Sequence, residues 1–209
     1  MGGPRATDKA TKKPSKLDAL DRFHPLSRAE WRTWLERNHR TSPGIWLVTF
    51  KKHTGKPRID YNQAVEELLC FGWVDSLPRA LDDERSMLLC TPRKPASKWS
   101  RPNKERVARM EAAGLMAERG RELVELARRT GTWTALDQIE NLVIPDDLAE
   151  RLAAHGPAQG HFEAFPRSVK RGILEWIASA KRPETRARRV EQTAALAAQN
   201  IRANQWPRR

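Results

Sequence analysis

Six polar and aromatic residues in the middle of the chain could together bind an anion: Asp75, Arg93, Ser97, Trp99, Ser100 and Asn103. An arginine guanidinium is a planar fork for carboxylate or phosphate, and hydroxyl and amide groups can add hydrogen bonds around it. A tryptophan ring offers a flat face for another ring or a cation. Asp75 could orient Arg93 or accept a proton from a ligand. The set predicts a small pocket for an anionic or amphipathic ligand.

The same residues also permit a purely structural interpretation. The segment "PRKP" is bounded by prolines and could be a rigid connector, while Ser100 and Asn103 could simply cap the following helix. Trp99 could be a plug between two halves of the molecule, and Asp75 and Arg93 could form an ion pair without a functional role. A helix that starts here would also offer N–H groups to an anion. The residues alone leave both interpretations open.

Catalytic and metal-binding patterns are not found in the sequence. Cys70, Asp75 and Ser76 lie close together, but no strand-to-helix nucleophile elbow and no nearby histidine base accompany them. The histidines are scattered, and no Cys/His cluster has zinc-site spacing. There is no glycine-rich phosphate loop. We therefore expect no metal, no cofactor and no catalytic residues, and an enzyme of unknown reaction remains an alternative.

The elements that must position the six residues alternate between helix and strand in the first half of the chain. Capping residues and helical spacing of apolar residues predict the helices, and short β-branched or aromatic runs predict the strands. Cys70 and Cys90 lie in apolar contexts and are expected to be buried thiols. In chain order we predict a helix that begins at Ser27, a strand over Gly44–Lys52, a helix capped by Asp60 and ended by Gly72, and strands near Trp73–Arg79 and Arg85–Cys90.

The pattern from Ser100 onward is helical. Two helices are expected near 103–113 and 117–130, then a short helix capped by Asp146, an amphipathic helix, and a last helix with Pro183 in its first turn. The amphipathic helix should bury Ile173, Leu174 and Ile177. The expected fold class is α+β, a small N-terminal α-β-α-β-β unit followed by a C-terminal helical half. The expected domains are a basic flexible tail over 1–20, an α+β unit over 21–100, and a helical region over 101–209 packed on it.

The chain is strongly basic, with a formal net charge of +13. The excess lies in 1–16, 91–129 and 181–209, and such blocks attract phosphates or acidic surfaces. A nucleic-acid binder that uses a basic face of 91–129 and 181–209 is therefore an alternative function, with affinity that falls steeply with salt. No helix-turn-helix, zinc-finger or RNA-binding motif supports it. High charge that serves only solubility is the other explanation.

The sequence predicts a cytoplasmic location. The first residues lack the apolar core of a signal peptide, and no apolar run approaches the roughly 18 residues that a bilayer span needs. We therefore expect no membrane insertion.

Several long blocks, in order, resemble the YdeI/OmpD-associated family of bacteriocin-protection (OmdA-like) proteins. They are "EWRTWLERNH", "GIWLVTFKK", "YNQAVEELLCFGWVDS", "PRKPASKWSRPNKERV" and "AKRPETRARRVEQT". The resemblance runs from about Phe23 to the end, and the family's signature falls on Gly72, Trp73, Asp75, Pro92, Arg93, Ser97, Trp99, Ser100 and Asn103. Pro102 departs from it, because an aliphatic residue is expected there, and proline disfavours helix in Arg101.

The resemblance implies a cytoplasmic protein linked to resistance against bacteriocins or antimicrobial peptides, and it implies no reaction or cofactor. We therefore predict a ligand-binding stress-response protein with a small anion-binding pocket, whose partner is an anionic small molecule or peptide. Direct capture of cationic bacteriocins is disfavoured because like charges repel. An indirect route would pass through an anionic metabolite, a nucleic acid or another protein.

Overall fold

The computed structural model describes residues 17–205. Residues 1–16 and 206–209 lie outside this range, and they include most of the predicted basic tail and the end of the basic segment 181–209. The contacts between residues divide the described chain into two compact units. The first, called the sheet unit, consists of 17–95 and 106–124, and the second, called the helical unit, consists of 96–105 and 125–205.

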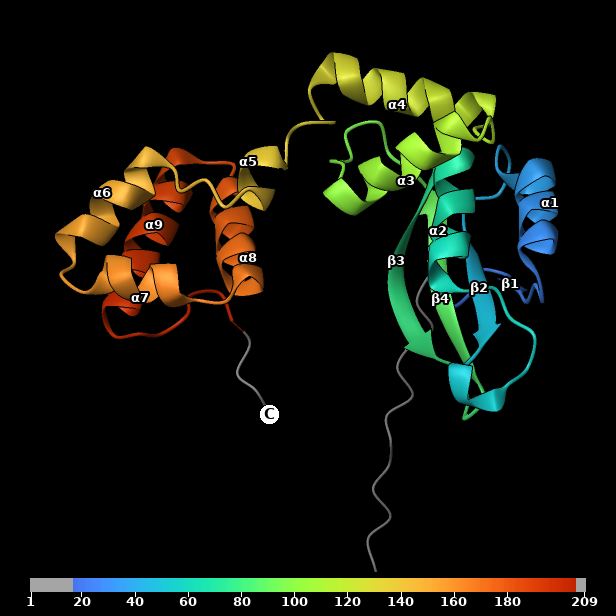
Figure 1. Cartoon of the computed structure of the whole chain (residues 1–209), viewed down its shortest axis with the longest axis horizontal. Helices are drawn as coiled ribbons and strands as arrows, with labels where there is room; N and C mark the ends of the chain where they lie inside the picture. The colour runs from blue at the N-terminus through green and yellow to red at the C-terminus, as the bar shows by residue number, and fades with distance from the viewer. Residues whose placement is uncertain (1–16, 206–209) are drawn as a thin grey trace, which may run out of the picture. The chain divides into compact units, whose positions relative to one another are not determined.

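The sheet unit contains a four-stranded sheet in the order β1-β2-β4-β3 (Figure 1). β1 runs parallel to β2, whereas β2 and β3 both run antiparallel to the central β4. The elements are β1 (Arg22–Phe23), α1 (Arg28–Asn38), β2 (Ile45–Phe50), the 3-10 turn η1 (Lys52–Thr54), α2 (Tyr61–Cys70), β3 (Trp73–Ala80) and β4 (Arg85–Pro92).

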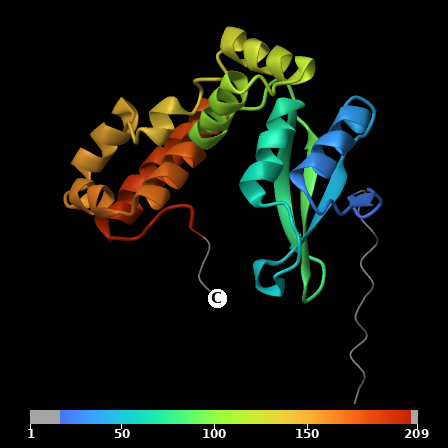
Figure 2. The same ribbon diagram turned by 45° about the vertical axis from the view of Figure 1, so that its right-hand side comes forward.

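The alternation of side chains along β2 and β4 gives the sheet two covered faces. Trp46 pairs with Leu89 and Val48 with Met87, so these four side chains share one face, where they form an apolar cluster. Leu47 and Leu88 pair in the same way on the opposite face. α2 lies across that opposite face (Figures 1 and 2). The start of α2 and this face of the sheet therefore enclose the space in which the candidate site lies.

Local sequence determines where the first two long helices begin. The Ser27 side chain accepts a hydrogen bond from the Glu30 N–H, as predicted, while the Glu30 carboxylate accepts from the N–H of Leu26 rather than of Ser27. Asp60 and Gln63 form a complete capping box at the start of α2. The predicted caps at Ser27 and Asp60 are thus confirmed.

A network of charged side chains joins α1, α2 and α3 (Arg101–Ala112) within the sheet unit. Arg28 bonds Glu67 at 2.5 Å and Glu66 at 3.0 Å. Arg32 also bonds Glu67, at 2.8 Å, and Arg109 bonds Glu66 at 2.8 Å. Glu66 and Glu67 are both buried. Because buried carboxylates are tolerated only when paired, these ion pairs restrict how the three helices pack.

The helical unit consists mainly of α5 (Asp137–Glu140), α6 (Asp146–Ala154), α7 (Ala158–Ala164), α8 (Arg167–Ala178) and α9 (Pro183–Ala198). These helices enclose an apolar core in which Leu148, Phe162, Ile173, Ile177 and Ala194 are completely buried. α3 and α4 (Glu118–Thr130) each contribute residues to both units. Within the described residues, no helix has the length and apolar character that a membrane span requires.

The predicted α+β class and its main elements are confirmed. Ile173, Leu174 and Ile177 are buried as predicted, and so are the free thiols of Cys70 and Cys90. β2 is shorter than the predicted Gly44–Lys52 because Lys52 begins η1. β1, α5 and α7 were not predicted, since each is too short to give a periodic signal.

Two expectations about helix starts were wrong. Asp146 does not cap α6; Pro145 holds the cap position in an extended conformation that its ring favours, and Asp146 lies in the first turn. Pro102 does not keep Arg101 out of the helix, because α3 begins at Arg101 and includes Pro102 in its first turn. Backbone N–H groups in a first turn have no partner inside the helix, so proline removes no hydrogen bond there.

Candidate ligand-binding pocket

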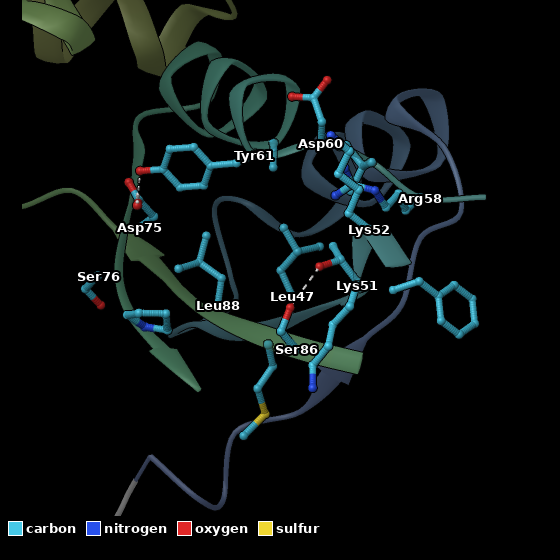
Figure 3. Close-up of a pocket in the computed structure, with 16 residues that line it drawn as sticks. Leu47, Lys51, Lys52, Arg58, Asp60, Tyr61, Asp75, Ser76, Ser86 and Leu88 are labelled. Atoms are coloured by element: carbon cyan, nitrogen blue, oxygen red, sulfur yellow. Dashed lines mark hydrogen bonds between the residues drawn. The ribbon is translucent and has the colours of Figure 1, made fainter. Parts of the chain in front are cut away.

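A cavity of about 490 Å³ lies in the sheet unit between the start of α2 and the sheet face that carries Leu47 and Leu88. Its volume is within the range of small-molecule sites. Figure 3 shows Leu47 and Leu88 at the centre of the pocket, with Tyr61 and Asp75 on one side and the basic residues that follow β2 on the other. The pocket therefore has an apolar floor and two chemically different ends.

The basic end is formed by Lys51, Lys52 and Arg58, all in the segment that connects β2 to α2. Lys51 donates a hydrogen bond to the Asp82 carbonyl at 2.7 Å. Lys52 and Arg58 are exposed, and within the described part of the chain neither forms an ion pair. Their neighbour Lys56 differs, because it is paired with Glu84 at 2.6 Å. Two cations thus lie at the rim of the pocket without an acidic partner among residues 17–205.

The other end is formed by Tyr61 and Asp75. The Tyr61 hydroxyl donates a hydrogen bond of 2.9 Å to Oδ2 of Asp75. Desolvation of the hydroxyl raises the pKa of Tyr61 although the residue is 54% exposed, and the hydrogen bond to the Asp75 carboxylate raises it further. Tyr61 is therefore neutral at physiological pH and keeps its proton for this bond.

Arg93 follows β4 and interacts electrostatically with Asp75. Its side chain is buried, and burial lowers its pKa to about 10, while the negative charge of Asp75 acts in the opposite direction. Arg93 therefore remains a cation near pH 7. That Asp75 orients Arg93 stays a prediction.

Hydroxyl groups line the space between the two ends. The side chains of Thr49 and Ser86, on neighbouring strands, are 3.5 Å apart in a weak hydrogen bond, and Ser76 lies on β3 beside Asp75. Each hydroxyl can donate or accept, so this lining adapts to different polar groups of a ligand.

The six residues that the sequence indicated are divided between the units. Asp75 and Arg93 belong to the sheet unit, whereas Ser97, Trp99, Ser100 and Asn103 belong to the helical unit. Trp99 is buried and its ring lies 5.1 Å from that of Trp133. The Ser100 carbonyl accepts a hydrogen bond from the Asn103 N–H at the start of α3. Only Asp75 lines the pocket.

The start of α3 already holds a carboxylate from the chain itself. Glu140, which is buried, accepts hydrogen bonds from the Arg101 N–H to both of its oxygens, at 3.0 and 2.9 Å. Lys104, one turn further, pairs with Asp137. An external anion considered for this helix start would therefore have to compete with Glu140.

A second cavity, of about 540 Å³, lies in the helical unit. Its charged lining residues are Asp137 and Arg186. Asp137 is paired with Lys104, and Arg186 forms two hydrogen bonds with Asp147 at 2.7 and 2.9 Å. Because these charges are already compensated, this cavity offers less to a charged ligand than the pocket of the sheet unit does.

Three residues of the pocket were not predicted as site residues: Lys52, Arg58 and Tyr61. They lie within the run "KKHTGKPRIDY", which joins a predicted strand to a predicted helix. Cationic and aromatic residues in such a connection were a usable signal, since binding residues concentrate in loops held by regular elements. What the sequence did not show is that this loop returns to the same sheet face as Asp75.

Comparison with protein-family models gives two matches. Residues 141–200 match the family described as "Bacteriocin-protection, YdeI or OmpD-Associated", which covers most of the helical unit. Residues 23–123 match a model described as "Domain of unknown function (DUF8412)", which covers most of the sheet unit. Comparison with curated proteins and with solved structures finds no match. The predicted resemblance to YdeI/OmpD-associated proteins is thus confirmed over 141–200, whereas four of the five blocks on which it was based lie within 23–123 and match the other model.

Proposed function

We propose that the protein binds a small anionic ligand with an apolar body in the pocket of the sheet unit. The observation that carries this proposal is the position of Lys52 and Arg58, which have no ion-pair partner among the described residues, beside a floor of Leu47 and Leu88. The two cations would bind the carboxylate or phosphate of the ligand. The leucines would remove its apolar part from water.

The energetics favour a ligand that uses both features together. An exposed ion pair contributes only about 0.2–1 kcal/mol, so cations at a rim are insufficient alone. Burial of apolar surface contributes about 25 cal/mol per Å², and the floor supplies that contribution. Anions without an apolar part, such as free phosphate, should therefore bind weakly.

A role in stress or antimicrobial-peptide resistance belongs to the same proposal. It is supported by the family match over 141–200, whose name refers to bacteriocin protection. With a net charge of +13, the protein would repel a cationic peptide, so an indirect route through a bound anion fits better. We propose that the protein acts in the cytoplasm.

The test is a ligand titration with straight-chain carboxylates, namely hexanoate, octanoate and decanoate, followed by NMR chemical shifts of backbone amides. The expected result is saturable shifts at Leu47, Tyr61 and Leu88 that weaken at least severalfold in the Lys52→Ala/Arg58→Ala double variant. Lys181→Ala/Arg182→Ala, on the helical unit, is the matched control because it removes the same charge. Equal binding by both double variants, or no saturable binding at all, would refute the proposal.

A second candidate function is nucleic-acid binding by the helical unit. Lys181, Arg182 and Arg188, at the start of α9, are exposed and form no ion pair within 17–205. By contrast, several cations of the predicted basic segment 91–129 are paired with acids, among them Arg101, Lys104 and Arg109. The surface proposed for nucleic acid is therefore smaller than the basic face of 91–129 and 181–209 predicted from sequence, because it uses the cations at the start of α9.

The same two double variants test nucleic-acid binding. Here Lys181→Ala/Arg182→Ala is the test, and Lys52→Ala/Arg58→Ala is the control. Binding of a single-stranded oligonucleotide, followed by fluorescence anisotropy, should weaken in Lys181→Ala/Arg182→Ala and not in Lys52→Ala/Arg58→Ala. It should also fall steeply with salt, because each phosphate contact releases counterions. Equal loss in both variants would indicate a general charge effect and no defined surface.

A further inference from the structure

The end of the pocket at Tyr61 and Asp75 has a specific hydrogen-bonding character. The Tyr61 hydroxyl donates its only proton in a hydrogen bond to Oδ2 of Asp75. The Ser76 hydroxyl beside this pair donates to the Leu89 carbonyl at 3.5 Å, so the lone pairs of the Tyr61 oxygen and of the Asp75 carboxylate are what the pair offers to a ligand, and they are acceptors. A ligand group that fits here must therefore be a hydrogen-bond donor.

The charges near this end of the pocket decide whether a charged or a neutral hydrogen-bond donor fits better. Asp75 acts electrostatically on the buried cation of Arg93, so one positive charge of the protein already lies within its field. The guanidinium of Arg106 lies 5.8 Å from the centre of the Tyr61 ring and adds a further positive charge near this end. An ammonium group here would be repelled by Arg106, whereas a hydroxyl could donate to the same acceptors without that repulsion.

The apolar floor separates this end from the basic end. Leu47 and Leu88 lie between Tyr61 and Lys51 in Figure 3, and Ile59 and Ala64 add further apolar lining to the pocket. A ligand that reaches both ends must place an apolar segment over these residues. Its two polar groups must then lie at opposite ends of that segment.

We propose that the ligand of this pocket is a hydroxylated anion, in which an apolar body carries a carboxylate or phosphate at one end and a hydroxyl donor at the other. The hydroxyl lies at the Tyr61–Asp75 pair, and the anionic group lies at Lys52 and Arg58. This inference rests on the function proposed above and specifies its ligand class.

The experiment compares three probes of equal length, octanoate, ω-hydroxyoctanoate and ω-aminooctanoate, by the same NMR titration of the full chain. Hydroxyoctanoate should bind about threefold to tenfold more tightly than octanoate, the gain of one hydrogen bond. That gain should shrink in Asp75→Asn, because an amide with one accepting oxygen replaces the carboxylate. It should remain in Asp146→Asn, a matched change in the helical unit. Hexanoate and decanoate with terminal hydroxyls extend the comparison to other lengths.

Tyr61→Phe keeps the inference testable if Asp75→Asn unfolds the protein. This variant retains the exposed ring and removes one acceptor, so the advantage of the hydroxyl should fall without being abolished. Tighter binding of aminooctanoate than of hydroxyoctanoate would overturn the choice of a neutral donor. If octanoate binds and no hydroxylated chain gains affinity at any length, the inference is wrong while the proposed function stands. If no carboxylate binds, both are wrong.

Discussion

The carboxylate of Glu140 accepts hydrogen bonds from the backbone N–H of Arg101 at 2.9 and 3.0 Å, at the first residue of α3. The Arg101 and Arg171 guanidinium groups lie 3.7 and 4.0 Å away. Glu140 is only 6% exposed, so the chain itself supplies the anion for this helix start. The segment 96–105 is thereby held within the helical unit by a charge that lies far from it in sequence.

This arrangement predicts that Glu140→Gln destabilises the protein by about 1–3 kcal/mol, because a charge-assisted bond at a buried position is lost. The measurement is chemical denaturation of the full chain. The control is Glu175→Gln, which removes a half-exposed partner of Arg171 on α8 and should cost less than about 0.5 kcal/mol. Equal effects of the two changes would show that Glu140 has no special role.

Glu67 should be the more sensitive carboxylate of the sheet unit. It is 1% exposed and bonds both Arg28 and Arg32. Glu67→Ala would leave Arg28 with Glu66 and Arg32 with the exposed Glu36, and it would remove the charge-assisted bonds of Glu67, so we expect a loss of about 1.5–3 kcal/mol in the free energy of unfolding. Glu36→Ala removes an exposed partner of Arg32 and should have little effect. A loss below about 1 kcal/mol for Glu67→Ala would mean that the network is not stabilising.

Gly120 marks the closest approach of α4 to the end of α2. A β-carbon at this position would lie 2.1 Å from the carbonyl oxygen of Cys70, which no side chain can accommodate without a backbone shift. We expect Gly120→Ala to destabilise the protein by about 1–3 kcal/mol despite the higher helix propensity of alanine.

Gly172, in α8, is the matched control for Gly120. A β-carbon there meets no atom within 4 Å, so Gly172→Ala should stabilise the protein by about 0.5–1 kcal/mol. The stability of both variants is measured by thermal and chemical unfolding. Stabilisation by Gly120→Ala would show that α2 and α4 do not lie this close together in solution.

The pair Asp147–Arg186 should contribute to the pH dependence of stability. The hydrogen bond from Arg186 lowers the pKa of Asp147 below its usual value of 3.8. The stabilising contribution is therefore present above about pH 4 and is lost as the pH falls through the lower, folded-state pKa. Asp147→Asn should lower stability at pH 7 by less than about 1 kcal/mol, because the carboxylate is half-exposed and screened by solvent.

The check is a series of denaturation curves from pH 2 to pH 7 for the native chain and for Asp147→Asn. The difference between them should be largest near neutral pH and shrink in acid, where the native carboxyl group is protonated as well. A difference that stays constant over the whole range would indicate that the substitution acts through packing rather than through charge.

Sequence alone was enough to predict the α+β class, the approximate bounds of the main elements and the caps at Ser27 and Asp60, because these depend on neighbours within a few residues. Ser27 and Asp60 are examples, since each cap bonds an N–H three positions along the chain. Burial of Ile173, Leu174 and Ile177 also followed from local periodicity.

Which polar side chains come into hydrogen-bonding contact depends on the tertiary fold. Tyr61 and Asp75 are hydrogen-bonded across α2 and β3, and Glu140 reaches Arg101 over 39 residues of chain. The six residues selected from sequence are instead divided between two units. Contacts of this kind depend on how helices and strands pack, and the spacing of residue types along the chain carries no record of that packing. The helices and strands could therefore be predicted from local sequence patterns, whereas the pocket and its two ends could be found only in the folded structure.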